Sequence, residues 1–560
     1  MRISDTSDLW YKNAVIYCLD VETFFDSDGD GVGDLAGLAQ RVDYLAGLGV
    51  TCLWLMPFYP SPDRDDGYDV ADFYGVDPRL GTHGDLVEFV RTAKDRGLRV
   101  IIDLLVNHTS DQHPWFQEAR KSVDNPYRDY YVWRSDPPGD TSDQVVFPDQ
   151  EDSIWQLDER TGEWYLHHFY RHQPDLNIAN PAVRDEIAKV MGFWLQLGVD
   201  GFRVDAVPFF LNNLGTAERE RHEFAQPHEY LQALRAFLQR RSGEAILLGE
   251  VNLPFADQPQ FFGGREGNEL TMMFDFVSMQ AAYLSMARQD ARPLANALLA
   301  RPKDKISPDS QYANFLRNHD ELTLDQLSPE ERQEVFDAFG PEPEMQLYGR
   351  GLKRRLPPML DGDPRRLKMA YSLLFALPGT PVLFYGEEIG MGENLQMPGR
   401  NAVRSPMQWT AEESAGFSTA DADKLAAPVV PGGFGPEYVN VAAARNDPDS
   451  LLNHVIRMAQ RYRESPELGW GNLEVLDQPH HAVLAHRCTW DEASVVLLHN
   501  LGPEPVTVPL TLPEAEGTVL IDLLQQGECA VDAEHRVELA LDGYGYRWLR
   551  VKRPGDRRLP

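Results

Sequence analysis

The chain has 560 residues, enough for a large core and two or three domains. Its net charge of -34 argues against nucleic acid or an anionic membrane as a partner, and is typical of a solvated acidic surface. No apolar run is long enough to cross a membrane, and the N-terminus has no signal-like apolar core. The four cysteines form no CxxC pair, which favours free thiols in a reducing compartment. We therefore expect a soluble cytoplasmic protein.

Eight short apolar runs, each typical of a buried strand, recur over the first 390 residues. Amphipathic stretches of helical periodicity lie between them, for example at 35–49, 83–97 and 181–198. Repeated strand–helix units favour a parallel sheet, and eight of them favour a closed (β/α)8 TIM barrel of the α/β class. The predicted strands are 14–21, 51–57, 98–105, 199–206, 245–251, 270–276, 312–318 and 380–386.

The segment DSDGDGVGD at 26–34 follows the first predicted strand. Its alternating carboxylates are typical of a calcium-binding loop, and Gly31 stands at the sixth position, where a sharp turn is needed. The twelfth position is Gly37 instead of Glu, so the loop is not a complete EF-hand. A merely solvated Asp/Gly loop is the alternative. We predict a structural Ca²⁺ with ligands from Asp26, Asp28, Asp30, Val32 and Asp34.

Three segments depart from the strand–helix alternation. Residues 107–175 are aromatic and polar, and we predict that they form an inserted subdomain after the third strand, over the barrel mouth. A charged, lid-like excursion follows the seventh strand at 321–360. Near the C-terminus, short strands alternate with turns, which predicts an antiparallel β-sandwich domain at 448–560. The barrel would then comprise residues 1–106 and 176–447.

Four of the predicted strands end in polar residues that an active site could use. Because the carboxyl ends of barrel strands meet at one face, we expect these side chains to collect there. Three carboxylates without a Ser or Cys nucleophile indicate glycosidic-bond chemistry. Arg203 and Asp205 alone could equally be a structural ion pair. The four segments are DLLVNH (103–108), GFRVDA (201–206), LLGEVN (247–252) and FLRNHDE (315–321).

In the glycosidase interpretation each carboxylate has a separate role. Asp205 is the nucleophile, kept ionised by Arg203 on the same face of its strand. Glu250 is the general acid/base, with a pKa raised by burial and by the charge of Asp205. Asp320 would hold sugar hydroxyls in the transition state.

Further polar residues would bind the sugar. His108 and His319 could donate hydrogen bonds to hydroxyls, although a histidine is more often a core residue. The segment GYDVADFY at 67–74 reaches the same face, and its Asp69 could bind a hydroxyl. Arg404, in the segment VRSPMQW, could pair with Asp69.

Together the four segments resemble the signature regions of the α-amylase superfamily, glycoside hydrolase family 13, and QPDLN at 173–177 resembles its fifth region. The resemblance covers essentially the whole chain. It implies a retaining mechanism through a covalent glucosyl–Asp205 intermediate, with Glu250 as acid/base, Asp320 as transition-state stabiliser, and no organic cofactor. It also implies a second calcium bound by Asn107 and Asp175. The implied glucose contacts are Asp69, His108, Gln173, Arg203, His319 and Asp320, and we add Arg404.

Longer segments, such as FYPSPDRDDGYDVADFY, HQPDLNIANPAV and RNHDELTL, are most similar to the trehalose synthase branch of that family. The similarity implies a small α-glucoside substrate and interconversion of maltose and trehalose, and it favours a homodimer. One alternative is an exo-acting α-glucosidase, or a hydrolase or transferase acting on trehalose, sucrose or another small α-glucoside. A non-enzymatic binding barrel is a third alternative, although such proteins lose the carboxylates and carry a membrane anchor.

Three segments differ from that branch. Residues 209–212 read Phe-Phe-Leu-Asn where the branch has Tyr-Leu-Phe-Glu, so Asn212 replaces an acidic ligand of the second calcium. The fifth strand ends GEVN at 249–252 instead of AEANQ, and the first ends CLDVETFF instead of EVHVRAFF. These differences lie near the expected site, so they bear on which acceptor receives the glucose.

Overall fold

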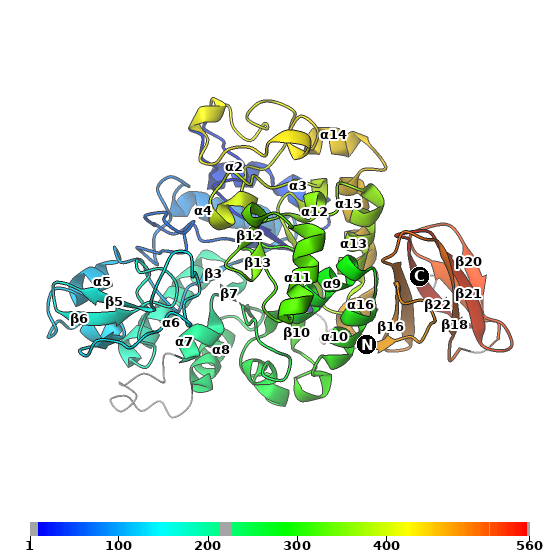
Figure 1. Ribbon diagram of the computed structural model, residues 1–560, viewed down its shortest axis with the longest axis horizontal. Coiled ribbons are helices and arrows are strands. Elements are labelled where there is room, and N and C mark those ends of the chain that lie inside the picture. The colour runs from blue at the N-terminus through cyan, green and yellow to red at the C-terminus, as the bar shows by residue number, and fades with distance from the viewer. Residues whose placement is uncertain (1–8, 213–226, 515, 557–560) are drawn as a thin grey trace.

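The computed structural model describes residues 9–212, 227–514 and 516–556. Eight parallel strands form a closed barrel at the centre of the molecule (Figure 1). The barrel strands are β1 (Ile16–Leu19), β2 (Cys52–Leu55), β3 (Arg99–Leu104), β7 (Gly201–Val204), β8 (Ile246–Gly249), β9 (Met272–Phe274), β10 (Gln311–Asn314) and β14 (Thr380–Phe384). They follow one another around the barrel in chain order, and β1 pairs with β14 to close it, with Ile16 beside Val382. All eight predicted strands and the TIM-barrel fold are confirmed.

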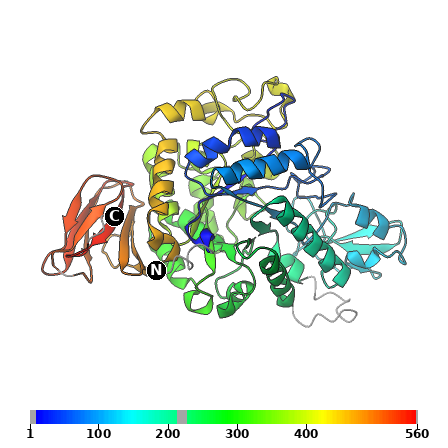
Figure 2. The same ribbon diagram turned by 180° about the vertical axis from the view of Figure 1, so that it is seen from behind.

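Helices cover the outside of the barrel, as Figures 1 and 2 show from opposite sides. The helix α4 (His83–Asp95) is typical: Thr82 and Asp85 form a capping box at its start, and Leu86, Phe89 and Ala93 share its buried face. The others are α2 (Leu35–Gln40), α3 (Val42–Gly47), α6 (Pro181–Leu197), α8 (His228–Arg241), α9 (Phe276–Arg288), α10 (Arg292–Ala300) and α13 (Pro364–Ala376). Among the helices described, none combines the length and apolarity that a bilayer crossing demands.

The chain between β3 and α6 forms a subdomain at one side of the barrel, coloured cyan in Figure 1. It holds α5 (Pro114–Ala119) and a three-stranded antiparallel sheet of β4 (Trp133–Arg134), β5 (Trp155–Asp158) and β6 (Glu163–Leu166). The rings of Phe116, Trp133 and Tyr165 pack together between them, which explains the aromatic composition of this segment. A bridge pairs His108 with Asp175, so the start and the end of the subdomain lie together at the barrel.

A second insertion lies between β10 and α13. It contains β11 (Leu322–Thr323), α11 (Pro329–Phe339), β12 (Gln346–Leu347), β13 (Gly351–Leu352) and the short α12 (Leu356–Met359). Its Arg350 donates a hydrogen bond to the carbonyl oxygen of Val146 at 2.7 Å. The two insertions therefore touch one another.

The C-terminal strands form the predicted antiparallel β domain, which stands beside the barrel (Figure 1). A six-stranded sheet in the order β15-β16-β17-β22-β19-β20 is accompanied by the β18-β21 pair. Val496, Leu510 and Leu539 are among the side chains of its separate apolar core. The strands are β15 (Asn472–Val475), β16 (Val483–Trp490), β17 (Ala493–Asn500), β18 (Val506–Thr511), β19 (Val519–Asp522), β20 (Glu528–Ala530), β21 (Arg536–Leu541) and β22 (Tyr546–Lys552).

Residues 448–470, placed in the β domain on sequence grounds, contain no strand. They form α15 (Leu451–Arg463) and α16 (Pro466–Trp470). The buried side chains of α15 recur with helical spacing, and the hydroxyl of Tyr462 donates to the carbonyl oxygens of Lys12 at 3.1 Å and Gly379 at 2.8 Å. Both acceptors precede barrel strands, so α15 packs at the base of the barrel and the β strands begin only at Asn472.

Candidate active site

A pocket of about 470 Å³ lies at the carboxyl ends of the barrel strands. Ends of strands and both insertions contribute to its wall. The three predicted catalytic carboxylates line it, together with both predicted histidines. The polar lining includes His108, Asp205, Glu250, His319, Asp320, Asp65 and Arg400, and the aromatic lining includes Phe147, Phe169 and Phe209.

Arg203 connects the carboxylates beneath this pocket. It is almost fully buried on β7, donates to Asp103 at 2.7 Å and to Glu250 at 2.8 Å, and also contacts Asp205. Asp103 is its register partner on β3, and Trp54 donates to the other oxygen of Asp103 at 2.7 Å. Parallel pairing of β3, β7 and β8 thus brings three acids around one guanidinium group.

Asp205 and Glu250 differ in their affinity for a proton. Burial raises the pKa of Asp205 to about 6, against the opposing charge of Arg203. Burial also raises the pKa of Glu250, to about 7, with a further contribution from the charge of Asp205. The amide of Ala206 donates to Glu250 at 3.2 Å from a backbone φ of 49°, in the left-handed region. Near neutral pH the site therefore favours an ionised Asp205 beside a Glu250 that can hold a proton.

Asp320 is surrounded by cationic and hydrogen-bonding groups. Arg400 donates to its Oδ1 at 2.6 Å and Arg404 at 3.2 Å, while Nε2 of His319 lies 3.2 Å from Oδ2. Burial alone would raise the pKa of Asp320, but His319 and the two arginines outweigh it and hold the pKa well below its usual range. The hydroxyl of Tyr68 lies 2.7 Å from the same His319 nitrogen. Asp320 is thus held ionised in a fixed orientation.

The residues at this end of the pocket differ from those expected. Asp65 and Arg400 line the pocket and form an ion pair at 2.5 Å. Asp69 is fully buried and accepts a hydrogen bond from Ser61 at 2.8 Å, whereas Arg404 lies 2.8 Å from Asp66. The expected pairing of Arg404 with Asp69 is therefore wrong, because the loop after β2 turns Asp69 away from the sugar site.

His108 and Gln173 reach the site in different ways. His108 lines the pocket, packs against Phe169 and lies 3.2 Å from the carbonyl oxygen of Tyr68. Gln173 is fully buried and donates to Asp65 at 2.8 Å. Gln173 therefore supports Asp65 from behind.

Other lining residues were not foreseen. Asn252 donates to both oxygens of Asp325 at 2.9 and 3.0 Å, and Arg350 lies 3.2 Å from Glu321. All four line the pocket. Three of them lie within five residues of a catalytic carboxylate in sequence, and that proximity was the available signal. Arg350 comes from the second insertion and gave no such signal.

The acidic loop after β1 brings three of its five predicted calcium ligands together. Carboxylate oxygens of Asp26, Asp28 and Asp34 lie within 4.8 Å of one another. Asp30 instead accepts the amide of Val32 at 2.8 Å. Asp34 also caps α2. A group of three hard oxygen ligands fits a calcium ion, with Asp30 outside the group.

Asn107 and Asp175 also lie together, as the second calcium requires. The amide of Asn107 donates to Asp175 at 3.2 Å, and its Oδ1 is buried without a hydrogen-bond partner among the described residues. The imidazole of His168 contacts the other oxygen of Asp175. The side chain of Asn212 lies outside the described part of the chain. The acidic pair of ligands that a cation needs is therefore incomplete here.

Comparisons with known proteins agree with this geometry. The family model "Alpha amylase, catalytic domain" matches residues 19–333 and 353–471, and "Sucrose hydrolase-like, C-terminal domain" matches 493–550. A trehalose synthase of Pimelobacter sp. (strain R48) is 39% identical over 97% of this chain and 96% of its own. An oligo-1,6-glucosidase of Parageobacillus thermoglucosidasius is 29% identical over 98% of this chain and 100% of its own.

Solved structures give the same result. A mutant of the trehalulose synthase MutB, in complex with Tris, has a TM-score of 0.76 and 27% identity, covering 97% of this chain and 100% of its own. The matched residues include the barrel, the acid cluster around Arg203 and both α15 and α16. The chain is an enzyme of the α-amylase family, glycoside hydrolase family 13.

Proposed function

We propose that the enzyme interconverts maltose and trehalose by moving a glucosyl unit through a covalent intermediate on Asp205. Two findings support this proposal. The pocket offers one nucleophilic carboxylate, one proton-holding carboxyl and one carboxylate held ionised by arginines. A relative that is 39% identical over nearly the whole chain is a trehalose synthase.

The first step forms the intermediate. An oxygen of Asp205 attacks the anomeric carbon of the non-reducing glucose of maltose, and the glycosidic bond breaks. The electron pair of that bond goes to the leaving oxygen, which takes the proton of Glu250. Arg203 contacts both acids and offsets the negative charge that Glu250 gains. Asp320 would stabilise the positive charge on the sugar ring through its hydroxyls.

The second step decides between isomerase and hydrolase. In the isomerase, the freed glucose turns, and its anomeric hydroxyl attacks the glucosyl carbon while Glu250 takes the proton. In the hydrolase, water attacks instead. A site that retains glucose and excludes water favours the isomerase. The observation that carries the proposal is the contact between the two insertions at the pocket wall, where Arg350 bonds both to Val146 and to Glu321.

The test is the product of maltose turnover. We expect trehalose to dominate over glucose. When ¹³C-labelled free glucose is added, we expect little label in the trehalose, because the transferred unit never leaves the site. Glucose as the only product would refute the isomerase and leave an α-glucosidase.

A hydrolytic α-glucosidase is the second candidate, and one observation favours it. Phe209 lines the pocket and packs against Phe169, where the trehalose synthase branch has a tyrosine. The acceptor side therefore lacks one hydroxyl that could hold the freed glucose. The label experiment separates the two candidates, because a hydrolase gives unlabelled glucose and no trehalose.

We further propose that Asp26, Asp28 and Asp34 bind one structural calcium ion. It would screen three carboxylates that otherwise repel one another. The loop also contacts the segment after β14, since Ser418 donates to Asp26 at 2.5 Å. The ion would thus stabilise a junction between two distant parts of the barrel, and no catalytic step depends on it.

A further inference from the structure

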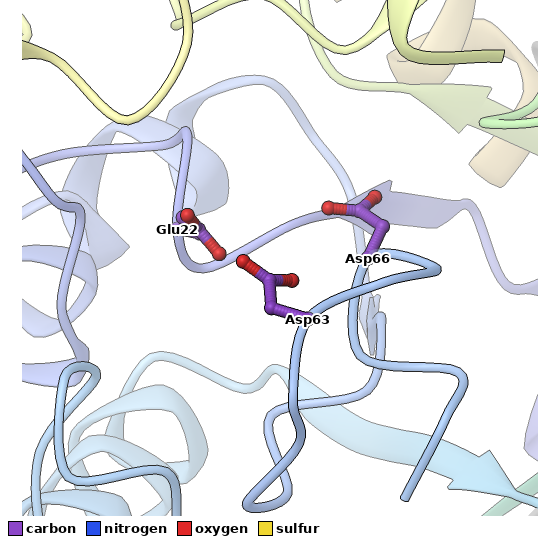
Figure 3. Close-up of side chains that lie close together, drawn as sticks. All are labelled: Glu22, Asp63 and Asp66. Atoms are coloured by element: carbon purple, nitrogen blue, oxygen red, sulfur yellow. The ribbon is translucent and has the colours of Figure 1, made fainter. Parts of the chain in front are cut away.

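A second cavity, of about 320 Å³, adjoins the catalytic pocket. Asp65 and Arg400 line both cavities, so their ion pair stands between them. Three acids line the second cavity: Glu22 from the segment after β1, and Asp63 and Asp66 from the loop after β2 (Figure 3). Their carboxylate oxygens lie within 4.8 Å of one another. None of these three residues lines the catalytic pocket.

This acidic cluster, Glu22, Asp63 and Asp66, faces two arginines. Arg79 lies 3.2 Å from Glu22 and 3.1 Å from Asp63, and it also pairs with Asp77 at 3.1 Å. Asp66 pairs with Arg404 at 2.8 Å. Asp20 adds a fourth carboxylate whose charge acts on both Glu22 and Asp66, and it accepts the hydroxyl of Thr23 at 2.8 Å. The negative groups therefore outnumber the positive charges available to them.

Fewer negative charges can be held here than there are acids. Burial raises the pKa of Glu22 to about 9, with further contributions from the charges of Asp20, Asp63 and Asp66. Burial likewise raises the pKa of Asp66, although Arg404 opposes the shift. At neutral pH the cluster consequently retains a proton, which belongs to the coupled group and to no single carboxyl.

Arg404 connects the cluster to the catalytic site. It is almost fully buried, and its three nitrogens have separate partners. Nη1 faces Asp66, Nε donates to the carbonyl oxygen of His319 at 2.8 Å, and Nη2 donates to Asp320 at 3.2 Å. Arg400, the other arginine on Asp320, is held by Asp65. Two consecutive aspartates therefore hold the two arginines that orient Asp320.

We propose that Asp66 is a positioning residue for Asp320, acting through Arg404, and that the proton held by the cluster with Glu22 and Asp63 maintains this link. Loss of the proton would add negative charge beside Asp66 and draw Arg404 away from Asp320. Asp65 and Arg400 face the same arginine and complete the set of charges around it. The proposal rests on the role of Asp320 in glucosyl transfer, whether the acceptor is glucose or water.

The first test uses Glu22→Gln, which mimics the protonated acid. The substrate is α-glucosyl fluoride, because fluoride leaves without a proton from Glu250 and the ionisation of Glu250 then does not mask the effect. We expect kcat of the wild type to fall as pH rises through about 9, and kcat of Glu22→Gln to stay level to pH 10. Glu334→Gln, on the exposed helix α11, is the matched control and should follow the wild type. Superimposable profiles for all three proteins would overturn the role of the proton.

The second test uses Asp66→Asn and Asp66→Glu. Asp320 acts in the transition state, so we expect Asp66→Asn to lower kcat at least tenfold with less than a threefold change in KM, and Asp66→Glu to recover part of the loss. Unchanged kcat in Asp66→Asn would overturn the positioning role. Both tests read the rate of glucosyl release and not the identity of the product. A wild type that gives glucose instead of trehalose would therefore refute the proposed isomerase and leave this inference intact.

Discussion

Glu250 accepts a hydrogen bond from Arg203 at 2.8 Å and nevertheless has a pKa raised to about 7. An adjacent guanidinium normally lowers the pKa of a carboxyl group, so burial is the stronger effect here. The same arginine contacts Asp205, whose pKa rises only to about 6. One cation thus serves two acids that titrate in the order the chemistry needs.

This order predicts a bell-shaped dependence of maltose turnover on pH. Below about pH 6 Asp205 gains a proton and loses its nucleophilicity, and above about pH 7 Glu250 loses the proton that the leaving oxygen requires. We expect the maximum of kcat/KM between these two values. A steady rise of kcat/KM up to pH 9 would contradict the assignment.

Replacing Glu250 by Gln should separate the two halves of the reaction. The amide cannot donate a catalytic proton to an alcohol leaving group, so we expect maltose turnover to fall by at least about 1,000-fold. Burst kinetics with α-glucosyl fluoride should still show formation of the glucosyl enzyme, because that substrate needs no acid. Asp205→Asn, the paired control, should lack the burst. A burst in Asp205→Asn would refute its role as nucleophile.

The ion pair of Asp65 and Arg400 should matter for sugar binding far more than Asp69. Asp65 lines the pocket, and a hydrogen bond to a charged group is worth about 1.5–3 kcal/mol, so Asp65→Asn should lower kcat/KM about 10- to 100-fold. Asp69→Asn should mainly lower the melting temperature, because the bonds of Asp69 stay within its own loop. Equal losses of kcat/KM in both variants would show that Asp69 contacts the sugar after all.

Chelation should destabilise the protein without a direct effect on chemistry. An ion bound at a hundred times its Kd stabilises the folded state by about 2.7 kcal/mol, so removal of calcium by EDTA should lower the melting temperature by a few degrees. We expect Asp28→Asn to remove this response and Asp30→Asn to keep it, since Asp30 lies outside the group of three. Calorimetry with and without EDTA measures both. A response lost in Asp30→Asn and kept in Asp28→Asn would contradict the assigned ligands.

Phe209→Tyr tests the acceptor side. A hydroxyl on this ring would give the freed glucose a hydrogen-bond partner and lengthen its stay beside the glucosyl enzyme. We expect the ratio of trehalose to glucose from maltose to rise severalfold, with total turnover within about threefold of the wild type. Phe255→Tyr, at a buried aromatic ring outside the pocket wall, is the control. An unchanged product ratio would show that this ring does not decide the acceptor.

The barrel and the catalytic carboxylates could be predicted because each depends on a regular repeat. Alternation along β7 places Arg203 and Asp205 on one face, and parallel pairing then brings Glu250 beside them. The choice between Asp65 and Asp69 has no such basis. Their loop contains two non-glycine residues with positive φ, Asp63 at 60° and Asp66 at 51°, so spacing along the sequence does not tell which side chain faces the sugar.

Helix α15 shows a different limit. Its apolar residues have helical spacing, but a short segment beside a run of strands was assigned with its neighbours. Only the contacts of Tyr462 with the chain before β1 and β14 show that this helix completes the barrel. Such long-range contacts leave no local pattern in the sequence.

The pairing of β1 with β14 has a consequence for the birth of this protein. Val382 leaves the ribosome roughly 360 residues after Ile16, which at about 5–20 residues per second is a delay of tens of seconds. During that interval β1 has its β2 neighbour but an open edge on the other side. The nascent chain must therefore protect that edge until synthesis is two-thirds complete, and slower translation would lengthen its exposure to aggregation and to dependence on chaperones.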